Sequence, residues 1–508
     1  MRKYVIIIML TWLAFLSACH CFQEDNRLEQ ALQFAGTNRP ELEKVLEHYE
    51  GDSLKYKAAK FLIMNMPYHF AAESWFVSPK GERYRPDMAL FAGKKEVQRH
   101  CDSLLAAGYR IERRNSYDIR QIKADYLTDR IDQAFEVWAK PWAGEVSFDD
   151  FCRYILPYRS QNEPLTGLGR TLMERYLPLL DSAGVRTPIE ACSLLNTLLK
   201  EKIKYVETGS PLAVTMEDME RSGKGTCEAL CDYTVHAMRA VGIPVAVHLT
   251  VWTRMARGHV WPAVLSGGRF HDFSPGDLNP DTYPEVLYER DYLRPAKVYR
   301  KNYEATTDVP ACDDGYVTFL KNPLIEDVTD GQPVPVYTLR IPLEPSLPEA
   351  SPAKGEDCLL YLCAFNNWRW TPVASGVPDG EGNAVFHNVA GRNFFMVARA
   401  EGKDRLRMVS APVCTCGDGS FRALPARPDS AVCHTFRKQA DTDFQLEYWD
   451  CTEHRFRALS PQARTDTTLF YSNVPADALL FFHPAVGTMH DRVGVIDTDG
   501  VYKQSYSW

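Results

Sequence analysis

The stretch from Gly223 to Asp272 reads GKGTCEALCDYTVHAMRAVGIPVAVHLTVWTRMARGHVWPAVLSGGRFHD. A cysteine directly follows a glycine-containing turn and opens a segment with apolar residues at helical spacing, so a helix is predicted to start at Cys227. Gly242 and Pro244 are predicted to end it, because glycine fits the left-handed position after a helix and proline cannot continue one. The rest of the chain is interpreted outward from this helix.

Three strand-like runs follow the predicted helix. They are rich in β-branched and aromatic residues, and a turn of Ser266, Gly267 and Gly268 joins the last two. The predicted strands are Val245–Thr253, His259–Leu265 and Arg269–Phe273. The chain order is therefore a cysteine at a helix start, a histidine on one strand and an aspartate on the next.

This order of residues suits nucleophilic catalysis. A thiol attacks as thiolate, and a helix N-terminus beside an imidazole lowers the pKa of a cysteine. Cys227 is predicted to be the nucleophile and His259 the base that takes its proton and returns it to a leaving amine. Asp272 is predicted to hold the imidazole in the correct tautomer and orientation.

At these residues the chain resembles the transglutaminase-like family of papain-fold cysteine enzymes. The resemblance covers roughly Pro188 to Leu293 and rests on the motifs GxC (Gly225, Cys227), GIP (Gly242, Ile243, Pro244), HxW (His259, Trp261) and an Asp followed by an aromatic residue (Asp272, Phe273). It implies an α+β papain-like domain with Cys227 as nucleophile, His259 as base and Asp272 as the residue that orients it.

Two residues depart from this pattern. Pro262 removes a hydrogen-bond donor from the histidine strand, which predicts an edge or a bulge there. Asp277 lies close enough in sequence to compete with Asp272 for the third role. Cys231, one helical turn after Cys227, is predicted to pack in the core.

Length and composition limit the other possibilities. A chain of 508 residues with 45% hydrophobic residues can form about three or four domains. The net charge is −8 without a long basic run, which gives no support for nucleic-acid binding. Fourteen cysteines are spread along the chain, and their spacing indicates neither a zinc site nor a disulfide connectivity. No cofactor and no metal are predicted.

The N-terminus is typical of an export signal. Arg2 and Lys3 precede an apolar run too short to span a bilayer comfortably, so residues 1–18 are predicted to be a signal peptide. The sequence Leu16-Ser-Ala-Cys19 resembles the lipobox of bacterial lipoproteins, which implies lipidation at Cys19 and a cell-envelope location on the outer membrane, facing the periplasm or the surface. The alternative is a soluble secreted protein cleaved after Ala18.

Residues 19–185 are predicted to be a helical N-terminal region, from apolar residues repeated at helical spacing. Its stretch Ser147 to Leu165 is dense in aromatic and arginine residues. Tyr158, Arg159 and Glu163 either line the approach to Cys227 or join the helical region to the catalytic domain.

The catalytic domain is predicted at 186–304, with a linker candidate at Ala305–Asp314. Short alternating runs with Pro and Gly breaks then predict two β-sandwich domains, at 318–420 and 434–508. Trp368, Trp370 and Trp449 either stack on a glycan or are buried core tryptophans.

The sequence therefore predicts a lipid-anchored cysteine peptidase or amidase that acts on a protein or peptide through a thioester. Hydrolysis is favoured over crosslinking, because an exported site is open to water. The alternative is a non-catalytic surface module that binds a protein or glycan on a transglutaminase-like scaffold.

Overall fold

The computed structural model describes residues 24–253, 258–280, 282, 295–306, 315–344, 359–426, 433–439, 444–465, 468–484, 492–496 and 502–503. Cys19 and the expected signal segment lie outside these residues. The described residues fall into two compact units. The first is drawn from Met1–Val247, Trp261–Tyr283 and Lys301–Ala305, and the second from His248–Val260, Pro284–Arg300 and Thr306–Trp508.

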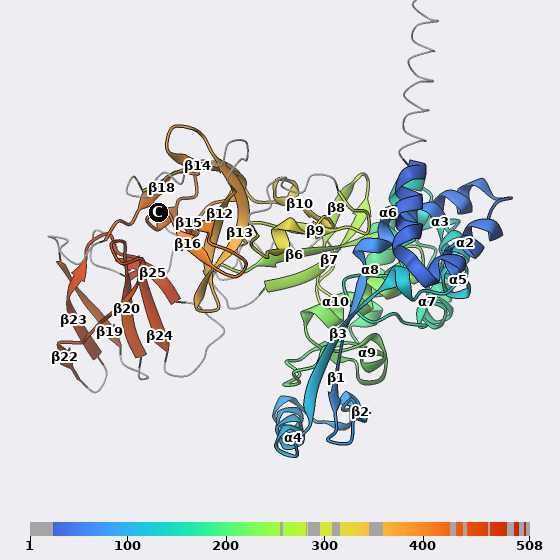
Figure 1. Ribbon diagram of the computed structural model, residues 1–508, viewed down its shortest axis with the longest axis horizontal. Helices are drawn as coiled ribbons and strands as arrows, with labels where there is room; N and C mark the ends of the chain where they lie inside the picture. The colour runs from blue at the N-terminus through green and yellow to red at the C-terminus, as the bar shows by residue number, and fades with distance from the viewer. Residues whose placement is uncertain are drawn as a thin grey trace, which may run out of the picture. The chain divides into compact units, whose positions relative to one another are not determined.

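Helices dominate the first unit, as predicted (Figure 1). After a helix at 24–35 come α2 Arg39–His48, α3 Ser53–Asn65, α4 Lys94–Ala106, α5 Ala124–Trp138, α6 Phe148–Tyr154, α7 Gly169–Ala183, α8 Pro188–Leu199, α9 Met216–Ser222 and α10 Cys227–Ala240. None of the described helices combines the length and the apolar composition that crossing a lipid bilayer requires.

A small antiparallel sheet interrupts the helical region and was not predicted. Strand β1 Phe70–Val77 pairs along its whole length with β3 Arg110–Tyr117, and β2 Arg83–Tyr84 pairs with the end of β1. Val97 of α4 packs with Phe76 of β1 in a buried cluster. The helical region therefore contains its own α+β subdomain.

Tyr303 returns to the N-terminal helices after a long excursion of the chain. Its ring stacks on His69 with centroids 4.1 Å apart, and His69 Nε2 donates to the Tyr303 carbonyl at 2.8 Å. The Tyr303 hydroxyl donates to the Leu62 carbonyl at 3.2 Å. Residues far beyond position 185 therefore complete the packing of the helical region.

Helix α10 is the central helix of the first unit, and it packs against α5, α7, α8 and α9. Gly242 follows its C-terminus with a φ of +81°, which confirms the predicted left-handed glycine. A Cβ at this position would lie 2.4 Å from the carbonyl oxygen of Val137 on α5. Glycine is thus required for both the turn and the close approach of α5.

Gly242→Ala is expected to lower the free energy of unfolding by about 2–4 kcal/mol, because alanine is strained at positive φ and would also press on α5. Gly267→Ala is the matched control, since Gly267 has a φ of +59° and a Cβ added there would meet no atom within 4 Å. It should lose only about 1–2 kcal/mol. Urea denaturation of both variants tests this, and equal losses would contradict a packing role for Gly242.

The three strands predicted after α10 are present within two residues of their expected bounds. They are β6 Val245–Val251, β7 Gly258–Ser266 and β8 Arg269–Asp272. With β9 Tyr299–Lys301 and β10 Ile325–Asp327 they form one sheet in the order β10-β9-β6-β7-β8. The cysteine helix is therefore followed by the histidine strand and the aspartate strand, and these two strands are neighbours.

The remainder of the second unit consists mainly of antiparallel strands. One sheet has the order β11-β14-β13-β12-β15-β17-β18, with β16 paired to β15, and the others have the orders β19-β23-β22 and β21-β20-β24-β25-β26. The strands are β11 Val336–Pro342, β12 Leu360–Asn366, β13 Arg369–Pro378, β14 Asn383–Ala390, β15 Phe394–Ala400, β16 Leu406–Met408, β17 Val413–Thr415, β18 Phe421–Ala423, β19 Cys433–Gln439, β20 Phe444–Asp450, β21 Arg455–Leu459, β22 Ala463–Arg464, β23 Thr468–Pro475, β24 Leu480–Pro484, β25 Arg492–Ile496 and β26 Tyr502–Lys503. Short strands thus fill the region in which the alternating runs predicted them.

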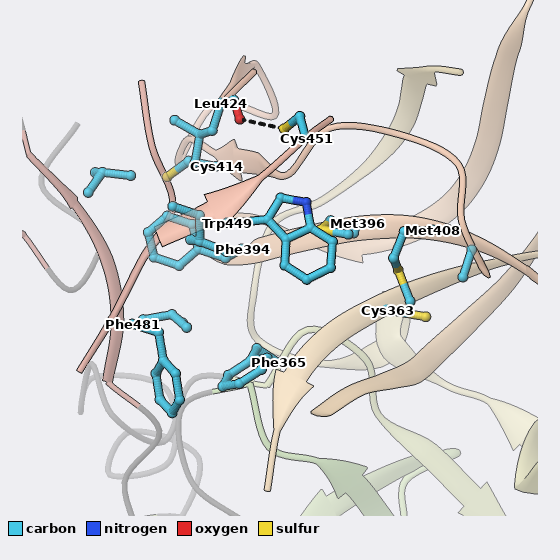
Figure 2. Close-up of a cluster of buried hydrophobic side chains, with 14 of the residues drawn as sticks. Cys363, Phe365, Phe394, Met396, Met408, Cys414, Leu424, Trp449, Cys451 and Phe481 are labelled. Atoms are coloured by element: carbon cyan, nitrogen blue, oxygen red, sulfur yellow. Dashed lines mark hydrogen bonds between the residues drawn. The ribbon is translucent and has the colours of Figure 1, made fainter. Parts of the chain in front are cut away.

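Strand β12 is buried on both faces. Tyr361, Cys363 and Phe365 belong to one hydrophobic cluster, and the alternate residues Leu360, Leu362 and Ala364 belong to another. Figure 2 shows the first cluster, in which Trp449 of β20 lies among side chains of β12 and β15. Trp449 is only 5% exposed. Of the two interpretations of this tryptophan, the structure supports the buried core residue.

Candidate active site

Cys227 is the first residue of α10 and is half-buried. The backbone of Thr226 before it is extended, and the Leu230 N–H donates to the Thr226 carbonyl at 2.9 Å, so the helix begins at the cysteine itself. The peptide N–H groups of a first helical turn carry partial positive charge. A helix start is a suitable place for a nucleophilic sulfur, because a negative charge that develops there is stabilised.

Gly223 and Gly225, before Cys227, lie so close to neighbouring atoms that a side chain would not fit at either position. Gly223 ends α9 with a φ of +64°, and a Cβ there would lie 2.2 Å from the Lys202 carbonyl oxygen. A Cβ on Gly225 would lie 2.7 Å from the sulfur of Met219 and 2.8 Å from the Cβ of Ala229. The GKG sequence is thus needed to fit the segment between α9 and α10.

His259 lies near the start of β7 and is half-buried. Its ring stacks on Trp252, with centroids 5.4 Å apart and planes 17° from parallel. Burial lowers the pKa of His259 to about 4. The imidazole is therefore neutral at pH 7, which is the form that accepts a proton.

Asp272 is the last residue of β8 and is 4% exposed. It lies opposite Ala263 of β7. Because side chains alternate along a strand, Trp261 and Ala263 share the face of the sheet on which Asp272 lies. Asp277, the competing candidate, is exposed in the turn that follows.

Pro262 does not mark an edge strand, because β7 lies between β6 and β8. It faces Phe273, one residue past the end of β8, and accepts from the Phe273 N–H at 3.1 Å. The missing N–H of proline is tolerated where the partner strand has ended. The register between β7 and β8 runs without a bulge from Ala263 to Ser266.

Asn196 of α8 holds the loop after Asp272 and was missed by the sequence analysis. Its side-chain oxygen accepts from the Gly276 N–H at 2.7 Å, and its amide donates to the carbonyls of Ser274 at 3.1 Å and Leu278 at 3.3 Å. It is buried, and these partners replace its contacts with water. Asn196 therefore fixes the segment that leads away from Asp272.

Tyr158, Arg159 and Glu163 are buried, at 3%, 3% and 7% exposure, and do not form an open approach to Cys227. Arg159 forms two hydrogen bonds with Asp118, from Nε to Oδ2 at 2.7 Å and from Nη2 to Oδ1 at 2.6 Å. The Tyr158 hydroxyl donates to Asp118 at 3.1 Å. Of the two roles predicted for these residues, the structure supports the structural one.

Glu163 connects this network to α10. Its Oε1 lies 2.7 Å from Nε2 of His236 on that helix, and its carboxylate accepts from the Ser160 and Gln161 N–H groups at 2.7 and 2.8 Å. Burial raises the pKa of Glu163, but the hydrogen bond and charge of His236 outweigh it and hold the pKa below its usual value. A charged Glu163 thus ties the 158–163 segment to the cysteine helix.

Arg239 ties down the other end of α10. The buried guanidinium donates to the carbonyls of Arg159 at 2.6 Å, Val245 at 3.0 Å and Tyr154 at 3.2 Å. Two of these carbonyls belong to the segment 154–159, and the third belongs to the first residue of β6. The helix that presents Cys227 is therefore held by buried polar contacts along its length.

A cysteine at a helix start, followed in the chain by histidine and aspartate strands, is the order of elements that the sequence motifs predicted. Residues 180–275 match the sequence model of the transglutaminase-like superfamily. The chain therefore carries a transglutaminase-like domain, which confirms the resemblance predicted from the GxC, GIP and HxW motifs.

Two other comparisons add little to this family match. A solved structure from Cytophaga hutchinsonii, described as a candidate cysteine protease, is 13% identical over 22% of this chain and 38% of its own, with a TM-score of 0.18. The match thus spans less than half of that protein. No curated protein matches this chain.

The low pKa of His259 predicts the acid limb of the pH profile. Only neutral His259 accepts a proton, so kcat/KM is expected to fall as the pH drops through about 4, not through the ordinary histidine value of 6.5. Because the folded pKa lies below the unfolded one, His259 also stabilises the fold above pH 6.5, and this contribution is lost as the pH falls toward 4.

Kinetics between pH 3.5 and pH 8 measure this limb: the rate should stay near its plateau down to about pH 5 and fall about fourfold by pH 3.5. His271→Gln, on the neighbouring strand β8, is the matched control and should leave the limb in place. A limb near 6.5 would show that His259 titrates as an exposed imidazole, contrary to this prediction.

Proposed function

We propose that this protein is an exported, lipid-anchored cysteine enzyme that cleaves or transfers acyl groups at amide or isopeptide bonds of a protein or peptide. The observation that carries the proposal is the position of Cys227, the first residue of α10, inside the segment that matches the transglutaminase-like superfamily. His259 and Asp272 are the proposed partners of the cysteine.

In the first half of the reaction, His259 takes the proton of the Cys227 thiol while the sulfur attacks the carbonyl carbon of the amide. The oxyanion that forms is stabilised by the Cys227 N–H at the helix start, a natural first donor. The carbon–nitrogen bond then breaks, and the amine leaves with the proton from His259. Asp272 keeps the imidazole in the tautomer that both transfers need.

The second half of the reaction consumes the thioester. Water attacks the thioester carbonyl and gives a carboxylic acid and the free thiol, whereas an attacking lysine amine gives a new amide. We favour hydrolysis, because water is the abundant nucleophile at an exported site. The protein is then a peptidase or amidase.

Trapping the intermediate tests this function directly. The purified protein is mixed with a peptide amide or a cell-wall peptide amide, quenched in acid and measured by intact mass, and the acyl adduct should map to Cys227. Addition of butylamine then measures the competition with water. Mainly free acid product supports hydrolysis, and mainly butylamide product would make the enzyme a transamidase.

The anchor proposal rests on the LSAC sequence that ends at Cys19, which lies outside the described residues. Cys19→Ser is expected to move the protein from the detergent phase to the aqueous phase of a Triton X-114 extraction, because several acyl chains give stable membrane attachment at about 0.8 kcal/mol per methylene. Cys21→Ser, two residues away, is the control. Aqueous partitioning of the unmodified protein would rule out the anchor.

A further inference from the structure

The second unit contains a groove of about 780 Å³ that is separate in the sequence from the proposed catalytic residues. Its walls come from the β12–β13 hairpin, from the segment around β16 and from the β20–β21 hairpin, and they combine aromatic with charged side chains. The volume lies in the range of small-ligand sites.

The tip of the β12–β13 hairpin presents a tryptophan at an unfavourable backbone position. Asn366 pairs with Arg369, which leaves Asn367 and Trp368 as a two-residue turn with φ values of 51° and 68°. Glycine is the usual second residue of such a turn, and a bulky residue there is an outlier. Trp368 is nevertheless 38% exposed and lines the groove, at a conformational cost of about 1–3 kcal/mol.

Several polar atoms of the groove wall have no hydrogen-bond partner among the described residues. They are Trp370 Nε1, Thr371 Oγ1, Trp449 Nε1 and His454 Nδ1, all in residues that line the groove. Trp449 is the most buried of them, at 5% exposure, and Figure 2 shows its indole within the hydrophobic cluster. These atoms are buried within the wall and do not face the groove, so the exposed side chains carry the case for a ligand.

The charges of the groove favour an anionic ligand. Arg369, Arg405, Arg407 and Arg455 line it together with only Glu401 and Asp404. Glu401 lies 3.3 Å from Arg405 and 3.7 Å from Arg407, whereas Arg369 has no acidic partner among the residues that the structure describes. The Arg369 guanidinium, which lines the groove, is suited to bind a carboxylate of the ligand through two hydrogen bonds.

We infer that this groove binds an acidic oligosaccharide of the uronic acid class. Trp368 offers exposed aromatic surface to a sugar ring, and Arg369 pairs with the carboxylate. The modest excess of positive charge favours isolated carboxylates over a densely sulfated chain. The site does not depend on the proposed catalysis at Cys227.

Isothermal titration of the purified protein with tetragalacturonate tests the inference, and its methyl ester, which lacks the charges, is the matched ligand. The acid should bind at least about tenfold more tightly than the ester, which corresponds to 1.4 kcal/mol. Arg369→Gln should remove that preference. Trp368→Gly should weaken binding of both ligands about tenfold while the protein stays folded, because glycine accepts positive φ.

Arg340→Gln is the control variant, since Arg340 is an exposed arginine of β11 that lies outside the groove and pairs with Asp379 at 3.3 Å. Binding that is equal for Arg340→Gln and Arg369→Gln would overturn the inference. So would failure of both tetragalacturonate and a hyaluronan tetrasaccharide to bind, or tighter binding of an acidic peptide than of either sugar. Cys227→Ala should bind the sugars unchanged, which separates this outcome from failure of the catalytic proposal.

Discussion

Cys227→Ala is expected to lower amide turnover by roughly ten-thousandfold or more, because it removes the nucleophile on which thioester formation depends. The protein should stay folded, since Cys227 is half-buried at a helix start and alanine is a good helix former. Turnover is measured as the release of amine from a peptide amide. Retained turnover would rule out the proposed enzyme and favour the non-catalytic binding module.

Cys231→Ala is the matched control for this experiment. Cys231 lies one turn further along α10 and is fully buried, and burial raises the pKa of its thiol well above the ordinary value. Burial likewise raises the pKa of Cys101, Cys152 and Cys192. Iodoacetamide should therefore label Cys227 ahead of these four thiols, and Cys231→Ala should leave both labelling and turnover unchanged.

Arg159→Met is expected to lower the free energy of unfolding by about 3–5 kcal/mol, the usual effect of removing one partner of a buried ion pair. Asp118 is fully buried. Without Arg159, the Tyr158 hydroxyl is the one group of this network that still donates a hydrogen bond to the Asp118 carboxylate. Burial already raises the pKa of Asp118 even with Arg159 present. Urea denaturation at pH 7 measures the loss.

Two further variants make this test specific. Arg110→Met breaks an exposed pair with Glu112, whose atoms lie 2.7 Å apart, and should change stability by less than about 1 kcal/mol. The double variant Arg159→Met with Asp118→Leu removes both charges and should regain most of the loss. If Arg159→Met were as mild as Arg110→Met, the buried network would not hold the helical region together.

The local signals in the sequence predicted the cysteine helix and its strands well. Gly242 and Pro244 mark the end of α10 by turn chemistry that depends on neighbouring residues alone, and β6, β7 and β8 follow within two residues of expectation. The order of Cys227, His259 and Asp272 along these elements could be read for the same reason. Their catalytic roles stay predictions.

Features set by distant partners could not be predicted. Strand β3 reads RIERRNSY, which has the composition of a solvated surface, and only its pairing with β1 forty residues earlier makes it a strand. The role of Arg159 depended on Asp118, and that of Glu163 on His236, 73 positions away. Asn196 was missed because its partners lie about eighty positions later.

The return of Tyr303 to His69 has a consequence for synthesis on the ribosome. The helical region emerges first, but the ring that stacks on His69 and the hydroxyl that bonds to the Leu62 carbonyl belong to a residue made more than two hundred positions later. At about 5–20 residues per second, this part of the fold waits on the order of ten seconds or more for its last contact. Until Tyr303 is part of the folding chain, His69 lacks both its stacking partner and its hydrogen-bond acceptor, so the helical region reaches its final packing late.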